Sequence, residues 1–283
     1  MIADSRRAVL PAPMKPNPSA WPDNAVTICW LGHATVLINF YGIRVLIDPA
    51  FFSRVGINVG IGTAGPKRYI APALNIGDLP PIDVLLLSHA HMDHMDLPSL
   101  SRFPKDTFTV TAAKTSDILA GLRLQNLREV RWGDKPLFKG RQGELEIEAV
   151  EVKHWGKRFP NEEIDRGYNG FILRREGKSL LIGGDTAKTD AFAALRSKGP
   201  FEVAIMPIGA YNPWIRSHCT PEEAVGMANA ASARYIIPVH HQTFKLSDEP
   251  MTEPLERVQE ALKAEPQRLA LKQVGETFTL PTG

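Results

Sequence analysis

Short apolar runs that end in polar residues recur along this chain. Val84-Leu85-Leu86-Leu87 leads into Ser88, and Leu180-Leu181-Ile182 leads into two glycines. Runs of this length, bounded by glycine or polar residues, indicate buried strands. The pattern predicts strands near residues 25–31, 34–40, 43–48, 83–88, 107–111, 144–153, 169–175, 178–183, 202–206, 234–240 and 276–280.

Helical segments alternate with the later strands, and we expect them near residues 114–121, 187–197, 220–231 and 251–264. The third has a clear start, because Thr220 can cap it, Pro221 fits the first turn, and two glutamates follow at the positive end of the helix dipole. Gly42 and Gly177 favour tight hairpins. Together these patterns predict an α+β fold with two sheets packed face to face and helices outside each, a four-layer αββα sandwich.

The length of 283 residues allows one large or two small domains. Residues 1–22 contain Arg6-Arg7 and several prolines but no continuous apolar run, so we expect an extended or poorly ordered arm. Residues 23–283 are predicted to form a single domain. No secretory leader is recognisable, and no apolar stretch reaches the roughly 20 residues that a membrane-spanning helix needs.

The composition narrows the possible partners. The 33 basic and 31 acidic residues give a formal charge of +2, which is not the electrostatic footprint of a nucleic-acid-binding protein. Cys29 and Cys219 do not suggest a disulfide framework, so a cytoplasmic protein is expected. Cys219 fits a small, partly buried apolar side chain better than a thiol at a site edge.

Potential metal ligands are most concentrated in residues 88–96, where three imidazoles and two carboxylates follow the apolar run at 84–87. These ligands suit zinc, and less well iron, manganese or nickel. His89 and His91 point the same way along an extended chain. Asp93 and His94 then turn into the next segment, where they can hold a second ion. The alternative is a solvated loop, which eight histidines in the whole chain disfavour.

Further polar residues end other predicted strands. Asp185 either bridges two cations or caps the following helix. His154 ends an alternating run and can supply a third ligand beside His89 and His91. Only one of His240 and His241 is expected to be a ligand, since neighbours on a strand point to opposite sides. Asp48 either orients a ligating histidine or makes a turn before Pro49.

At this point the chain resembles the metallo-β-lactamase family, through His89-x-His91-x-Asp93-His94, His154, Asp185 and His240. More narrowly it resembles the branch with N-acyl-phosphatidylethanolamine-hydrolysing phospholipase D and ascorbate-6-phosphate lactonase. The matching segments lie at residues 30–37, 46–49, 65–68, 79–83, 154–155, 184–186, 207–211, 218–224 and 238–244. Segments 65–68 and 207–211 favour the phospholipase D side. His241 replaces the family's usual aromatic residue and Gln242 its usual glycine, which leaves the substrate open.

The resemblance implies the αββα fold and two divalent cations, most simply Zn²⁺, with Mn²⁺, Fe²⁺ or Ni²⁺ as alternatives. His89, His91 and His154 are assigned to the first ion, Asp93, His94 and His240 to the second, and Asp185 to both. Two cations about 3.5–4 Å apart can share a hydroxide and clamp a substrate oxygen. The hydroxide would attack phosphorus or a carbonyl carbon, and the cations would stabilise the developing oxygen charge.

Other residues are expected around these ligands. Asp48, His33 and Asp96 are the candidates behind them, and Asp93 and His218 are the candidate catalytic residues. His218 either protonates the leaving group or binds a substrate anion, and its alternative is a loop histidine bonded to backbone. The expected substrate contacts are Lys67, Arg68, Tyr211 and His241. Lys67, Arg68 and Arg216 suit a phosphate, although surface charges are commonly only solvated.

The expected function is that of a binuclear metal-dependent hydrolase, a phosphodiesterase of phospholipase D type acting on a small molecule or phospholipid. The alternatives are a lactone or carboxylic ester hydrolase and a non-catalytic metal-binding relative. Residues 52–72 set Val55, Ile57, Val59, Ile61 and Tyr69 among glycines. This segment either contacts lipid, as a peripheral membrane contact, or forms a lid over a small-molecule pocket.

Overall fold

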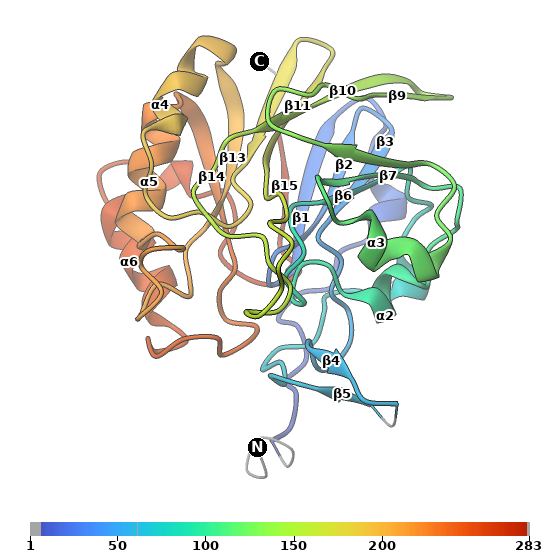
Figure 1. Ribbon diagram of the computed structural model, residues 1–283. Coiled ribbons are helices and arrows are strands. Elements are labelled where there is room, and N and C mark those ends of the chain that lie inside the picture. The colour runs from blue at the N-terminus through green and yellow to red at the C-terminus, as the bar shows by residue number, and fades with distance from the viewer. Residues whose placement is uncertain (1–6, 61, 282–283) are drawn as a thin grey trace.

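Two mixed β-sheets pack face to face in the computed structural model, which describes residues 7–60 and 62–281 (Figure 1). The first sheet has the order β15 (Thr277–Thr279), β1 (Val26–Gly32), β2 (Thr35–Phe40), β3 (Ile43–Ile47), β6 (Val84–Leu87), β7 (Phe108–Ala112) and β8 (Leu127–Val130). The second has the order β14 (Ala233–Val239), β13 (Phe201–Pro207), β12 (Lys178–Ile182), β11 (Gly170–Arg175), β10 (Gly143–Val150) and β9 (Leu137–Gly140).

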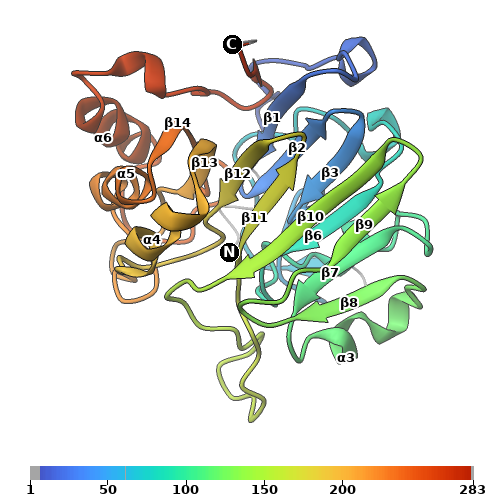
Figure 2. The same ribbon diagram turned by 90° about the horizontal axis from the view of Figure 1, so that it is seen from above.

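Alternation along the strands divides the apolar side chains between two cores. In the second sheet, Leu180 and Ile182 join the large core between the sheets, whereas Leu181 faces the helices. This is the period of two that a strand buried on both faces requires. Helices α4 (Ala191–Ala194), α5 (Pro221–Ala230) and α6 (Glu253–Ala261) cover the outer face of the second sheet, as Figure 2 shows from above.

The helices on the first sheet have 4 residues each, like α4, and are shorter than α5 and α6. Among the described residues, α2 (Leu97–Leu100) and α3 (Ser116–Leu119) lie beside β6, β7 and β8. Elsewhere in the described chain, 3₁₀ helices occur at Pro18–Ala20, Ile76–Asp78, Ala120–Leu122, Leu195–Lys198 and Pro266–Arg268. The expected four-layer α+β sandwich is therefore confirmed, with one thin outer layer. The helix predicted from residue 187 begins only at Ala191, because Ala187 donates its backbone N–H to the Lys153 carbonyl and keeps the chain extended.

The described part of the N-terminal arm runs extended along the domain. Leu10 exchanges backbone hydrogen bonds with Tyr69 and Ala71, and Met14 donates to the Val274 carbonyl. The arm thereby connects the segment after β5 to the chain before β15. Residues 1–6, with Arg6 among them, lie outside the described residues.

Residues 52–72 carry a short hairpin of β4 (Ile57–Asn58) and β5 (Thr63–Ala64). Its two sides approach so closely at Gly56 and Gly65, both with positive φ, that a Cβ at either would lie within about 2.1 Å of a backbone oxygen. Ile57 and Val59 are exposed on it, and Ile61 lies outside the described residues. Across the described ranges, no helix is long and apolar enough to cross a membrane.

Candidate metal centre

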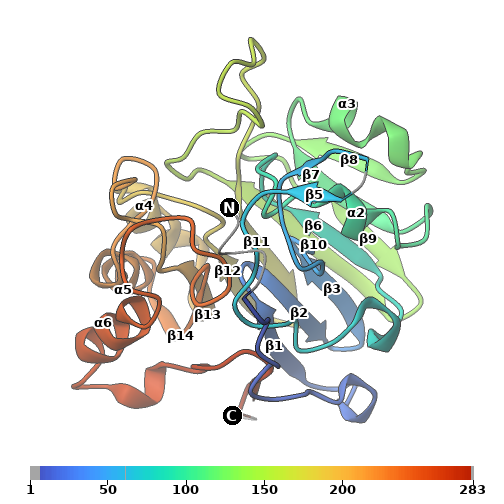
Figure 3. The ribbon, with the colours of Figure 1, turned by 90° about the horizontal axis from the view of Figure 1, so that it is seen from below.

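Strand ends from both sheets converge at one edge of the sandwich, which Figure 3 shows from below. Asp48 follows β3, His89 follows β6, His154 lies beyond the end of β10, and Asp185 and His240 follow β12 and β14. The sheet pairings run these strands in one direction within each sheet, so their carboxyl ends share an edge. This is where sites in sheets with parallel strands usually form.

The first group of ligand atoms belongs to His89, His91, His154 and Asp185, and these atoms lie within 4.8 Å of one another. His91 Nδ1 is 2.8 Å from His89 Nε2 and 3.2 Å from His154 Nε2. Three ring nitrogens therefore meet at one point. Asp185 Oδ2 stands 4.0 Å from His89 Nε2 and 3.9 Å from His154 Nε2, on the side that leads to the second group.

The second group is built around Asp93, His94 and His240, with His33 beside them. His240 Nε2 is 3.3 Å from Asp93 Oδ2, and both His94 Nε2 and His240 Nε2 are 3.2 Å from Asp185 Oδ2. Asp185 thus stands between the two groups. Its position agrees with the bridging role expected from the sequence and not with the helix-capping alternative, since the residue before α4 is Asp190.

The orientation of the histidines fits a pair of divalent cations. His89 Nδ1 lies 2.9 Å from Ser88 Oγ, His94 Nδ1 2.8 Å from Asp48 Oδ2, and His154 Nδ1 2.8 Å from the Ser217 carbonyl oxygen. Partners on one ring nitrogen fix the tautomer and direct the other nitrogen to a metal. Buried His94 Nε2, His240 Nε2 and Asp185 Oδ1 find no hydrogen-bond partner among the described residues, which is rare for buried polar atoms.

The pKa values of the histidines shift in different directions in the two groups. Burial lowers the pKa of His91 to about 3 and that of His154 to about 4, so both rings are neutral and offer lone pairs at pH 7. Burial alone would raise the pKa of Asp185, but the adjacent His240 and His94 hold it well below its usual range. Burial alone would lower the pKa of His240, but the neighbouring Asp185 outweighs this effect and raises the pKa to about 9.

Comparison with known proteins agrees with this geometry. A family model described as "Beta-lactamase superfamily domain" matches residues 43–241. The chain belongs to this superfamily. It is 30% identical over 249 residues to N-acyl-phosphatidylethanolamine-hydrolyzing phospholipase D 1 of Caenorhabditis elegans, covering 83% of this chain and 69% of that one. It is 28% identical to UPF0173 metal-dependent hydrolase MK1542 of Methanopyrus kandleri, covering 86% and 93%.

Solved structures show the same fold. An isothiocyanate hydrolase from Delia radicum gut bacteria superposes with a TM-score of 0.72 at 18% sequence identity, covering 90% of this chain and 100% of that one. The expected metallo-β-lactamase resemblance is therefore confirmed. The protein is a metallo-hydrolase of the beta-lactamase superfamily, and its His and Asp clusters are the groups that can bind the metal.

A pocket of about 180 Å³ opens onto the ligands of this beta-lactamase-superfamily protein. His91, Asp93, Asp185, His218 and His240 are among the residues that line it. His218 Nδ1 is 3.8 Å from Asp185 Oδ2 and has no hydrogen-bond partner within the described chain. Burial lowers the pKa of His218 to about 4. The structure thus places His218 at the pocket and not in a loop bonded to backbone.

The residues expected behind the ligands lie in two different places. Asp48 accepts hydrogen bonds from the Ser88 backbone and hydroxyl and from His94, and His33 Nε2 is 2.7 Å from Asp93 Oδ2. Both touch a ligand or the loop that carries it. Asp96 instead caps α2, where its carboxylate accepts from Ser99 N and Oγ.

The residues expected to contact substrate lie away from the lining of the metal pocket. Arg68 is buried and donates to the Ala50 carbonyl, and the Lys67 ammonium donates to the Arg7 carbonyl. The Tyr211 hydroxyl donates to Glu253 at 2.6 Å. Arg216 is exposed and does not line the metal pocket. None of these four side chains is in the lining of the metal pocket as the described residues form it, so their assignment to substrate binding stays a prediction.

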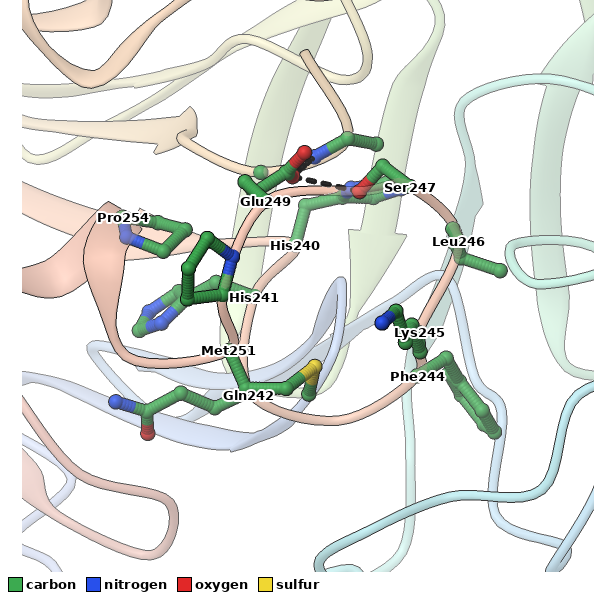
Figure 4. A pocket seen from close by; sticks show the side chains of 13 residues that line it. His240, His241, Gln242, Phe244, Lys245, Leu246, Ser247, Glu249, Met251 and Pro254 are labelled. Atoms are coloured by element: carbon green, nitrogen blue, oxygen red, sulfur yellow. Dashed lines mark hydrogen bonds between the residues drawn. The ribbon is translucent and has the colours of Figure 1, made fainter. Parts of the chain in front are cut away.

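His241 is not among the groups of described residues that could hold a metal ion. The His240–His241 pair follows the end of β14, where His240 has a left-handed φ of 63°, so strand alternation is not the reason that only one of them is a candidate ligand. The His241 ring stacks on Trp30 with centroids 4.4 Å apart, and it lines a small adjacent pocket drawn in Figure 4. Glu249 lies in the same pocket, where it accepts from Ser247 Oγ and the Ala210 backbone. A flat imidazole on Trp30 explains physically how histidine replaces the family's usual aromatic residue here.

Sequence reasoning missed several residues of the site. Trp155, Trp214 and Leu246 line the metal pocket, and Arg158 Nη1 donates to the carbonyls of Ala90 and Met95 in the ligand loop. Trp155 directly follows a ligand, which was a usable signal. Arg158 and Leu246 had none, because only the folded loops bring them to the site.

Proposed function

We propose that this protein is a binuclear metal-dependent phosphodiesterase of phospholipase D type. The observation that supports it most is the pair of ligand groups that share Asp185 in the lining of one pocket, with His218 Nδ1 3.8 Å from Asp185 Oδ2. The similarity to the C. elegans enzyme, whose name states hydrolysis of N-acyl-phosphatidylethanolamine, supports the choice of a phosphodiester. Two bound cations would supply activated water and neutralise charge on the substrate phosphate.

The chain's own residues would prepare this chemistry. His89, His91 and His154 would hold one cation, Asp93, His94 and His240 the other, and Asp185 both. His33 hydrogen-bonds Asp93 and keeps its carboxylate directed at the second position. His218 is neutral at pH 7 given its lowered pKa, so its role would be to donate an N–H hydrogen bond to the leaving oxygen.

The test is a substrate comparison with the zinc-loaded full chain. N-acylphosphatidylethanolamine, phosphatidylcholine, a nitrophenyl phosphodiester and an acyl homoserine lactone are supplied separately, and lipid products are separated by mass spectrometry. We expect phosphatidic acid and the free alcohol from the phospholipids. Hydrolysis of the lactone with no cleavage of any phosphodiester would refute the proposal and favour an ester hydrolase.

A matched pair of variants separates site chemistry from general damage. Asp185→Asn removes the shared carboxylate and should abolish phosphodiester cleavage. Asp190→Asn, five residues further on at the exposed start of α4, makes no side-chain capping bond and should retain activity. Equal activity in Asp185→Asn and the wild type would contradict the assignment of the metal site.

A further inference from the structure

The metal pocket is lined by apolar side chains as well as by the His and Asp groups. The apolar part consists of Trp155, Trp214, Ala210 and Leu246. The two indoles leave 40% and 56% of their surface exposed, and the neighbouring Ile215 leaves 46%. Tryptophan is usually far more buried, and a group of exposed apolar side chains around a pocket commonly marks a binding surface.

Both tryptophans are held in place by contacts within the site. The Trp155 ring meets the His91 ring edge-on, with centroids 4.3 Å apart. The Trp214 indole N–H donates to the Leu246 carbonyl at 3.2 Å. The Trp214 carbonyl in turn accepts the backbone N–H groups of Ser217 and His218, each at 2.9 Å. The apolar walls are therefore fixed relative to the ligands and to His218.

We propose that Trp155, Trp214 and Leu246 form an apolar collar that binds the hydrocarbon chain of the substrate directly beside the hydrolysed group. The inference rests on the proposed function in taking that group to be a phosphodiester. A pocket of about 180 Å³ is smaller than a typical ligand cavity, so it cannot enclose a long hydrocarbon chain as well as a phosphodiester. An attached chain would then extend past the apolar side chains that line the pocket.

The alternative is that the exposed tryptophans contact the surface of a bilayer. The position of the two tryptophans favours a single hydrocarbon chain over a bilayer surface as the occupant, because Trp155 and Trp214 are part of the pocket lining itself and do not stand apart from it at a loop tip. An indole offers a large, rigid apolar face on which a hydrocarbon chain can pack.

The test uses soluble nitrophenyl alkyl phosphodiesters with ethyl, butyl, hexyl and octyl chains, all below their micelle concentrations. Each methylene that enters an apolar contact should raise kcat/KM roughly fourfold, so three or four contacted methylenes give an octyl-to-ethyl ratio of roughly a hundredfold. Trp214→Ala should reduce that ratio to roughly tenfold or less. The ratio is taken within each variant, so partial loss of metal cancels.

Trp132→Ala is the matched control, since Trp132 is 44% exposed but lines a separate pocket beside Tyr168. It should keep the wild-type ratio. Trp155→Phe, which retains a ring against His91, should reduce the ratio less than Trp155→Ala while metal content stays intact. Wild-type ratios in both Trp214→Ala and Trp155→Ala, with losses only on phospholipid vesicles, would overturn the collar in favour of a bilayer contact.

A binding measurement separates this proposal from the proposed function. Zinc-loaded protein is titrated with octylphosphonate and with ethylphosphonate while tryptophan fluorescence is recorded. We expect tighter binding of the octyl compound and loss of this preference in Trp214→Ala. If no phosphodiester is cleaved but the preference persists, the proposed reaction fails and the collar stands. Equal binding of both phosphonates by the wild type would refute the collar.

Discussion

Replacing Asp48 with asparagine should weaken zinc binding without removing any ligand. The buried carboxylate accepts from Ser88 N at 2.8 Å through Oδ1, and from Ser88 Oγ at 2.6 Å and His94 Nδ1 at 2.8 Å through Oδ2. If the asparagine oxygen stays on Ser88 N, its amide group faces the His94 N–H, and two donors meet. The proton of His94 is then driven to Nε2, the nitrogen that points at the site.

The expected loss of zinc affinity in Asp48→Asn can be worked out from these contacts. Leaving one buried donor unpaired costs about 1–3 kcal/mol, and loss of a partner that orients a metal ligand typically costs about 10–100-fold in affinity. Both figures agree, because a tenfold change corresponds to about 1.4 kcal/mol. We therefore expect the second zinc ion to bind about 10–100-fold more weakly in Asp48→Asn.

Competition with a chromophoric chelator measures the two zinc affinities separately, and urea denaturation of the metal-free proteins measures stability. Asp83→Asn is the control, since Asp83 also accepts a backbone N–H, from Arg44 at 2.8 Å, but stands just before β6, at the end of that strand away from the site. Binding of both ions by Asp48→Asn within about twofold of the wild type would refute the reasoning.

Four further outcomes follow from the site. His91→Ala should lower metal content measured by mass spectrometry and abolish hydrolysis, and full occupancy would exclude His91 as a ligand. His240→Ala should lose the second ion, while His241→Ala should keep both ions. His241→Ala should lower the free energy of unfolding by about 1–3 kcal/mol, because packing on Trp30 is lost. Loss of an ion in His241→Ala but not in His240→Ala would show that the register is shifted by one. His218→Ala should impair substrates with poor leaving groups far more than nitrophenyl esters, and equal losses would leave it a binding role. Because the pKa of His240 is raised to about 9, its stabilisation of the metal-free protein is complete below about pH 6.5 and is lost as pH rises through 9. Zinc affinity should rise over the same pH range, because the ring must lose its proton to bind the ion. A flat pH profile of zinc affinity in a chelator competition would contradict this.

The strands around the site could be predicted because each is an apolar run that stops at a ligand. β6 before His89 and β12 before Asp185 are examples, and both lie within one residue of the expected bounds. β8 and β9 were not predicted. Leu127–Val130 and Leu137–Gly140 are short outer strands with exposed polar residues, so no continuous apolar run or clean alternation distinguishes them from loops.

The clustering of the candidate ligands could likewise be predicted, since strand-end histidines and carboxylates carry both the chemistry and the position. The pocket walls could not. Trp214 and Leu246 lie in irregular loops more than 30 residues apart, and only the folded chain brings them together, with a hydrogen bond from the Trp214 indole to the Leu246 carbonyl. The burial of Arg68 could not be predicted for a related reason, because a basic residue in a polar, glycine-rich segment gives no sign that its guanidinium lies over the Phe244 ring.

The exposed connection at residues 131–136 separates the chain into two parts, and neither part holds a complete set of ligands for one ion. His89, His91, Asp93 and His94 lie before it, and His154, Asp185 and His240 lie after it. Each cation would therefore act as a cross-link between distant halves of the sequence. A protein cut at this connection should reassemble from two separately made fragments more tightly when zinc is present, and a chelator should release them again.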